Sequence, residues 1–172
     1  MDLRIVKTRE QIRDAFLTLR DRFSPEKIKV KDICRIAMIN KTTFYKHYED
    51  SFALTEEIEN GAVDVFLSNF RERGRFFDAP KQYLSGMYEA FEKTAATLRV
   101  IFRDRFDVFC SKIERRLRQL YGEAPFTPRE EVAFSVVTGG FIKLLCDRRI
   151  QQQFDKNTLT EQAHKMLLAV MA

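Results

Sequence analysis

The 172-residue sequence contains few of the residues that interrupt helices. Only 6 residues are Gly and 4 are Pro, against 16 Phe, while Leu, Ile, Lys, Arg and Glu are abundant. This composition favours long helices joined by short connections over a sheet protein. The single Asn-Gly pair, Asn60-Gly61, lies within helical rather than alternating apolar spacing, so it is not expected to form a hairpin turn. We therefore predict an all-α fold.

Cysteine is also scarce, and its placement argues against the usual cysteine-based sites. Cys34, Cys110 and Cys146 are odd in number, far apart and each set among apolar residues at helical spacing. This pattern predicts neither a disulfide framework nor a zinc site. We expect reduced cysteines that fill apolar space, with oxidant sensing by one of them as the alternative.

The sequence lacks long apolar runs. No run approaches the ~18 residues that suggest a membrane span, and the opening stretch, MDLRIVKTREQIRDAF, is too charged for a secretory signal. These absences predict a cytoplasmic protein with no membrane partner.

Catalytic motifs are missing as well. The only histidines are His47 and His164, neither of which lies near a candidate nucleophile, and no phosphate-cradling loop of the form GxxxxGKS or GxxxxGKT occurs. We predict that the protein is not an enzyme and uses no cofactor or metal. A catalytic site assembled from distant parts of the chain is the alternative.

Charge, in contrast, is plentiful and unevenly distributed. Residues 1–48 hold 12 Lys plus Arg against 6 Asp plus Glu, a surplus of +6, whereas the rest of the chain holds 18 against 19, or −1. A basic end on a neutral body suits binding to a polyanion, because phosphate contacts release counterions irrespective of sequence. Solvated helix faces are the alternative explanation of the same surplus.

Three short helices are predicted within the first 50 residues. Apolar residues at helical spacing indicate an amphipathic helix from about Thr8 to Phe23. A second helix follows around residues 30–37, and a three-residue turn separates it from a third. Asn40 is a good N-cap for that third helix, which is expected to begin at Lys41 and to run for two turns.

The third helix, within the stretch NKTTFYKHY at 40–48, has two distinct faces. At about 100° per residue, Phe44 and Tyr48 fall one turn apart and can pack against the first two helices. Thr42, Tyr45 and Lys46 then face outward. Two helices joined by a short turn, the second carrying donors at its N-terminal end, are typical of a helix-turn-helix that reads base edges in the major groove. A small helical hairpin with a polar face is the alternative.

Further amphipathic helices are predicted beyond residue 50. The first is a long helix from Asp50-Ser51 to about Phe70, ended by the basic stretch RERGR (71–75), and the next opens at Pro80. One broken helix or two in succession follow from Leu98 to near Gly122. The last two run from Pro128 to about Arg149 and from Thr158 or Thr160 onward. Gly139 and Gly140 inside an apolar helix cost roughly 1 kcal/mol each relative to Ala. Close approach of another backbone, such as a dimer contact, is therefore expected there.

The segments TREQIRDAF (8–16), IKVKDICRIA (28–37) and INKTTFYKHYED (39–50) resemble the TetR family of transcriptional regulators. The resemblance covers roughly the first 60 residues, and the TFY-x-H core after a short turn is its distinctive mark. It implies an all-helical homodimer. Each subunit would have a three-helix, helix-turn-helix DNA-binding domain at 1–50 and a helical ligand-binding and dimerisation domain at 51–172.

Carried over by position, the resemblance implies eight DNA-contacting residues. The base contacts would be Lys41, Thr42 and Tyr45, and the phosphate contacts Lys31, Thr43, Lys46, His47 and Ser51. Three residues depart from the family pattern. Met38 stands where a turn glycine is common, which implies strain of order 1 kcal/mol or an altered turn. Lys29 replaces a capping threonine, and Ser51 replaces a frequent lysine.

The resemblance also implies an effector and a dimer contact. Family members often enclose a small apolar or aromatic effector among the middle helices, and the residues that could line such a cavity here are Leu84, Met87, Tyr88, Phe91, Phe102, Phe106, Phe109, Cys110 and Phe134. Phenylalanines at helical spacing are usually core residues, which is the alternative. Family dimers commonly pair the last two long helices, here about 128–149 and 158–171, with Gly139, Gly140, Leu144 and Leu167 at the interface.

The predicted function is that of a DNA-binding transcriptional regulator. We expect a homodimeric repressor that binds a palindromic double-stranded DNA operator and is released by a small-molecule effector. The alternative is a TetR-like helical adaptor or co-activator that acts through protein partners.

Overall fold

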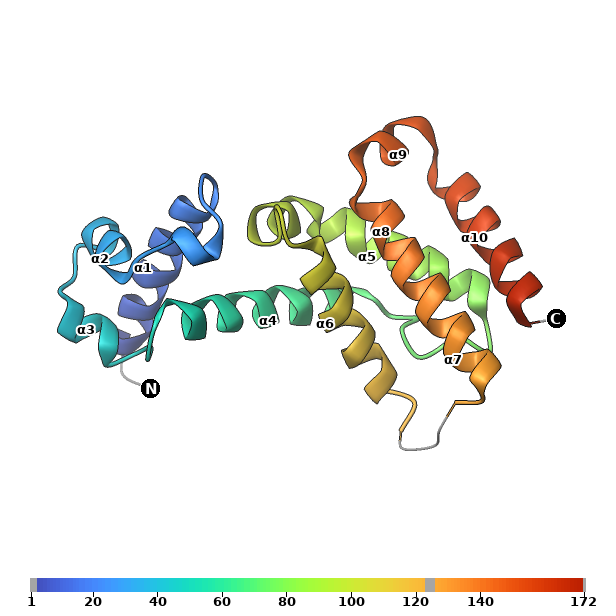
Figure 1. The fold of residues 1–172 in the computed structure, drawn as a ribbon, viewed down its shortest axis with the longest axis horizontal. Coiled ribbons are helices and arrows are strands. Elements are labelled where there is room, and N and C mark those ends of the chain that lie inside the picture. The colour runs from blue at the N-terminus through green and yellow to red at the C-terminus, as the bar shows by residue number, and fades with distance from the viewer. Residues whose placement is uncertain (1–2, 123–125, 172) are drawn as a thin grey trace. The chain divides into compact units, whose positions relative to one another are not determined.

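The computed structural model describes residues 3–122 and 126–171, and the regular elements within these ranges are all helices, which confirms the all-α prediction (Figure 1). In chain order they are α1 (Leu3–Arg20), the 3₁₀ turn η1 (Pro25–Lys27), α2 (Val30–Ala37), α3 (Lys41–Tyr45), α4 (Ser51–Asn69), α5 (Pro80–Ile101), α6 (Phe106–Gln119), α7 (Pro128–Phe134), the π-helical segment η2 (Ser135–Gly139), α8 (Gly140–Cys146), α9 (Arg148–Gln153) and α10 (Lys156–Met171). None of the helices in these ranges has both the length and the apolar character that a membrane span requires.

The chain divides into two compact units. The first unit comprises Met1–Ala62 with Thr97–Asp104, and the second comprises Val63–Ala96 with Arg105–Ala172. Helices α4 and α5 therefore each contribute residues to both units. The expected domain boundary after residue 50 stays a prediction.

The first unit is built on α1, which packs on α2, while α2 packs on α3. Ile12 and Phe16 of α1, Ile33 of α2 and Phe44 of α3 have at most 1% of their surface exposed and form its core. Burial of such large side chains contributes roughly 1.5–3 kcal/mol each. The core therefore sets the orientation of the short helix α3.

A buried arginine fastens the end of α5 into the first unit. Arg20, only 1% exposed, donates from Nε to the Ile101 carbonyl at 3.1 Å and from Nη1 to the Phe23 carbonyl at 2.9 Å. It also forms an ion pair with Asp104. A buried cation is tolerated only when it is paired and hydrogen-bonded, so Arg20 specifies where residues 97–104 join α1.

The second unit has an aromatic core. Its rings meet at centroid distances of 5.0 to 5.7 Å, edge to face except for the tilted pair Phe70 and Tyr83. They include Phe66, Phe70, Phe76, Tyr83, Phe109, Tyr121, Phe126 and Phe134. The geometry is the one that aromatic pairs prefer. Within this core the Tyr83 and Thr138 hydroxyls form a hydrogen bond of 3.1 Å, and burial raises the pKa of Tyr83 well above its usual value.

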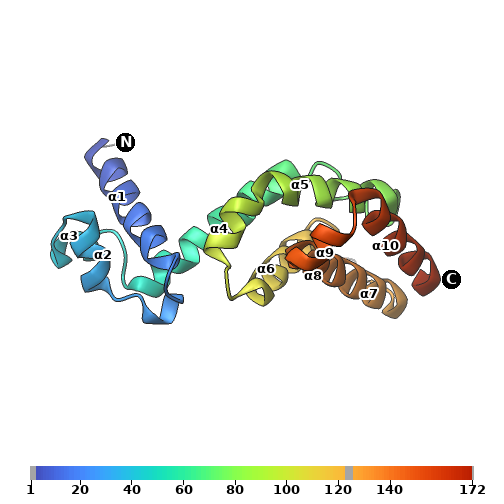
Figure 2. The same ribbon diagram turned by 90° about the horizontal axis from the view of Figure 1, so that it is seen from above.

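Figures 1 and 2 show α7, η2 and α8 following one another as a continuous rod, and α10 packs against α7 and η2. The rod begins where Pro128 predicted, because Thr127 and Glu130 form a capping box. It ends at Cys146 rather than near Arg149, because Asp147 caps the separate helix α9 by accepting from the Arg149 amide at 2.9 Å.

Other helix boundaries in the structure also differ from the predicted ones. The last helix begins at Lys156 rather than at Thr158 or Thr160, because Asp155 accepts from the Thr158 amide at 2.7 Å and acts as the N-cap. The segment from Leu98 to near Gly122, predicted as one broken helix or two in succession, does break. Its first residues continue α5 to Ile101, and α6 ends at Gln119. The first helix ends at Arg20 instead of Phe23.

Candidate DNA-binding surface

The turn between α2 and α3 is centred on Met38. Its φ of 52° and ψ of 43° lie in the left-handed region, as expected for a position where glycine is common. The amides of Met38 and Ile39 both donate to the Cys34 carbonyl and close the turn. At the other end of α2, the Lys29 side chain makes no capping hydrogen bond. This is as predicted, because an ammonium group cannot accept a hydrogen bond from the first amides of a helix.

Helix α3 begins where the sequence indicated. Asn40 Oδ1 accepts from the Thr43 amide at 2.7 Å, so Asn40 is the N-cap. The prediction of two turns was wrong, because regular α-helix ends at Tyr45. The next amides bond at shorter spacing, from Lys46 to the Thr43 carbonyl at 3.3 Å and from His47 to the Phe44 carbonyl at 2.9 Å, and tighten the chain into a 3₁₀-like turn.

Two rings anchor α3, as predicted. Phe44 is fully buried and Tyr48 is 5% exposed, with ring centroids 5.7 Å apart. Tyr45 also touches Phe44, edge to face at 5.6 Å, but is itself 55% exposed. The anchor rings therefore face the core of the first unit while Tyr45 faces solvent.

Tyr48 is further held by residues of α1 and α4. Its hydroxyl donates to Glu57 Oε1 at 3.0 Å, and the Arg9 guanidinium lies over its ring at 4.9 Å and pairs with Glu57. Burial and the Glu57 carboxylate raise the pKa of Tyr48 to about 12. Sequence reasoning missed Arg9 and Glu57, because residues 48 positions apart leave no local pattern.

The structure places the eight predicted DNA-contacting residues on or near the surface. Those with exposed side chains are Lys31, Lys41, Thr42, Tyr45 and Lys46, and those that are half-buried are Thr43, His47 and Ser51. Within the described part of the chain, none of the three lysines forms an ion pair, so their charges are available to phosphate oxygens. Their contacts to DNA stay a prediction.

The residues predicted to line an effector cavity are mostly core residues. Leu84, Met87, Phe91, Phe109 and Phe134 have no exposed surface. Tyr88 is 8% exposed, Phe102 is buried within the first unit, and Phe106 and Cys110 are half-buried. This burial agrees with their alternative role as core, and their role toward an effector stays a prediction.

The predicted interface residues differ in accessibility. Gly140 is exposed, Leu144 is 36% exposed and Gly139 is half-buried, whereas Leu167 is 3% exposed and already covered within the chain. A Cβ added at Gly140 would meet nothing within 4 Å, and its φ of −62° is an ordinary helical value. Nothing within the protomer therefore requires glycine at position 140.

The fold of this chain is similar to that of known transcriptional regulators. The sequence matches no family model and no curated protein. By structure, however, the chain matches a TetR transcriptional regulator from Streptococcus agalactiae with a TM-score of 0.65 and 26% identity over 95% of each chain. A TetR/AcrR-family transcriptional regulator from Aquifex aeolicus shares the fold, with a TM-score of 0.58 and 20% identity over 95% of this chain and 99% of the other.

The chain has the fold of TetR-family transcriptional regulators. This fold agrees with the resemblance seen in residues 8–50 and supports a DNA-binding helix-turn-helix protein. The α2-turn-α3 arrangement lies in the first unit, whose role as the DNA-binding domain stays a prediction. The basic surplus of residues 1–48 belongs to the same unit.

Proposed function

We propose that this TetR-family regulator is a homodimeric repressor that binds a palindromic DNA operator and is released from it by a small-molecule effector. The observation that carries the proposal is the two-sided character of α3. Phe44 and Tyr48 are buried, while Lys41, Thr42 and Tyr45 are exposed on its other side. A major groove admits one such helix.

The chemistry of the exposed set suits base and phosphate recognition. An ammonium group and a hydroxyl near the start of α3 can donate to base edges, and an aromatic ring can contact a thymine methyl. Lys31 and Lys46 carry charges that oppose the phosphates, which position the protein without specifying sequence. Specificity is therefore assigned to Lys41, Thr42 and Tyr45.

The rod formed by α7, η2 and α8 supports the proposed dimer. Val132, Val136, Gly140 and Leu144 recur at four-residue steps, and each is exposed in the single chain. Since Gly140 costs roughly 1 kcal/mol relative to Ala in a helix and nothing in the protomer approaches it, a second copy that packs closely against this stripe explains its presence.

Binding to DNA that flanks its own gene tests the proposal, with fluorescence anisotropy over a salt series. We expect affinity to fall steeply with salt, because phosphate contacts release counterions. Lys41→Ala and Tyr45→Ala should each weaken binding about tenfold or more, since a base contact contributes roughly 1–3 kcal/mol. Lys46→Ala should lower the salt slope by about 1.

Lys93→Ala is the matched control, because Lys93 is an exposed lysine of α5 within the second unit. It removes the same charge and should leave affinity unchanged. Affinity that is indifferent to salt and to Tyr45→Ala would contradict the proposal. If Tyr45→Ala and Lys46→Ala leave regulation in cells intact while a charge on the α7–η2–α8 stripe abolishes it, the protein acts through protein partners instead.

A further inference from the structure

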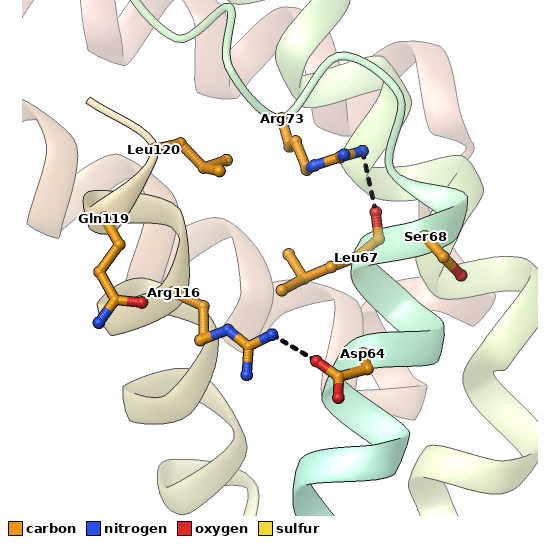
Figure 3. A pocket seen from close by; sticks show the side chains of 7 residues that line it. All are labelled: Asp64, Leu67, Ser68, Arg73, Arg116, Gln119 and Leu120. Atoms are coloured by element: carbon orange, nitrogen blue, oxygen red, sulfur yellow. Dashed lines mark hydrogen bonds and ion pairs between the residues drawn. The ribbon is translucent and has the colours of Figure 1, made fainter. Parts of the chain in front are cut away.

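The second unit contains a groove. The residues that line it are different from those predicted to bind an effector. It encloses about 370 Å³ and lies between the C-terminal part of α4 and the end of α6 (Figure 3). Its lining residues are Asp64, Leu67, Ser68, Arg73, Arg116, Gln119 and Leu120. The volume is within the range of small-molecule sites.

One wall of the groove presents Arg73, the middle arginine of the basic stretch 71–75. Its Nη1 donates to the Phe70 carbonyl at 2.9 Å and to the Leu67 carbonyl at 3.2 Å, at the end of α4. These bonds hold the guanidinium in place, and its Nε and Nη2 have no partner among the described residues. Arg73 is thus oriented by one nitrogen and can donate from two others.

A second arginine faces the groove from α6. Arg116 pairs with Asp64 of α4, and Figure 3 shows this pair across the groove from Arg73. The lining therefore carries two positive charges and one negative charge. The surplus of one positive charge suits a monoanion better than a neutral molecule or a dianion. Guanidinium groups also match the planar geometry of a carboxylate.

Apolar surface lies between the two arginines. The Leu67 and Leu120 side chains project into the space that separates them (Figure 3), and Leu120 is 50% exposed. An apolar group placed between these leucines would remove their side chains from water, which is favourable at roughly 25 cal/mol per Å². The groove thus combines cationic walls with an apolar centre.

We propose that this groove binds a small organic acid. Its carboxylate accepts from Arg116, and its apolar body lies against Leu67 and Leu120, while the Arg73 charge on the opposite wall adds to the positive potential of the groove. The inference rests on the proposed effector control, and it assigns the effector to a class of amphipathic monocarboxylates rather than neutral aromatic molecules. Because α4 continues from these C-terminal turns into the first unit, a ligand held there contacts a helix that both units share.

Titration calorimetry on the full chain without DNA tests the site. The probes are benzoate and hexanoate, with benzamide and hexanamide as uncharged isosteres. We expect saturable binding of at least one acid, and affinity about tenfold or more above that of its amide, because a hydrogen bond to a charged group contributes roughly 1.5–3 kcal/mol. Equal binding of acid and amide, or binding of neither acid, overturns the proposal.

Variants separate binding from a structural role. Arg116→Gln should weaken acid binding about tenfold, whereas Arg115→Gln, on the same helix but outside the groove lining, should leave it unchanged. Asp64→Asn should strengthen acid binding, because it removes the carboxylate that competes for Arg116. Arg73 also caps α4, so Arg73→Gln is interpreted only if circular dichroism shows a folded chain. If Arg116→Gln and Asp64→Asn leave acid affinity unchanged, the proposal is overturned.

Anisotropy of operator DNA with and without the acid separates this proposal from the proposed function. If the acid binds and lowers the affinity of the protein for operator DNA, the groove proposal and the proposed effector control are both supported. Acid that binds and leaves operator affinity unchanged supports the groove but overturns its role in effector control. An operator-binding protein that binds neither acid retains the proposed DNA binding and loses the groove proposal.

Discussion

At Met38 the backbone adopts a conformation that L side chains rarely take. Its φ of 52° lies in the left-handed region, and the side chain is 87% exposed, so it gains little packing in return. Left-handed backbone costs roughly 1–2 kcal/mol for a residue with a Cβ. The turn nevertheless holds, because two amides donate to the Cys34 carbonyl and the flanking helices are packed.

Met38→Gly should therefore stabilise the first unit by about 0.5–1 kcal/mol, since relief of strain exceeds the extra entropy that glycine adds to the unfolded chain. The measurement is the urea midpoint of unfolding. Met38→Ala keeps the Cβ and should leave the midpoint close to that of the wild type. A lower midpoint for Met38→Gly would show that the exposed methionine side chain is stabilising.

At the scale of elements, α3 is oriented by its neighbours. Five residues of α-helix are too few to be stable alone, so its position depends on Phe44 in the core and on Tyr48. Tyr48 reaches Glu57 of α4, and Arg9 of α1 covers its ring. The neutral Tyr48 hydroxyl is required as the donor to Glu57.

The stability of the first unit should consequently fall at high pH. The pKa of Tyr48 is raised from 10.0 to about 12, first by burial and then by Glu57. The neutral hydroxyl therefore favours the folded state fully below about pH 10, and this contribution is lost as the pH rises through about 12. The test is urea unfolding of the wild type and Tyr48→Phe across this range. Stability should fall more steeply in the wild type, and parallel curves would contradict the assignment.

The π-helical segment η2 is a second feature of element scale. Ser135 donates to Glu114 Oε1 at 2.8 Å and accepts from Arg118 at 3.2 Å, while Thr138 bonds Tyr83 on α5. These bonds from α6 and α5 fasten both ends of the segment. The spacing of apolar residues does not predict the extra residue of a π turn. The residues that bond to this segment, Glu114, Arg118 and Tyr83, lie on other helices.

At the scale of the whole molecule, a two-fold related operator requires two copies of α3. A single copy reads one half-site, and dimers gain affinity by reading two half-sites at a spacing set by the helical repeat of DNA. The surface proposed to join the copies is the exposed stripe of Val132, Val136, Gly140 and Leu144.

Val136→Asp should convert the proposed dimer to a monomer, because it places a charge without a partner within the apolar stripe. Sedimentation velocity measures the oligomeric state, and operator affinity should fall with it. Val65→Asp is the control, since Val65 is as exposed as Val136, at 53% against 50%, but lies on α4. A Val136→Asp protein that remains dimeric would place the interface elsewhere.

Local chemistry in the sequence was sufficient to predict the start of α3 and the side of it that is buried. Asn40 caps α3, and Phe44 and Tyr48 are buried one turn apart, because caps and helical faces depend on residues within about four positions of one another. Contacts between residues far apart in the chain are visible only once it is folded. Arg20 with Ile101, Arg9 with Glu57, and Arg116 with Asp64 are pairs separated by 48 to 81 positions. These pairs form because helix packing brings distant parts of the chain together, and a local sequence pattern does not predict such contacts.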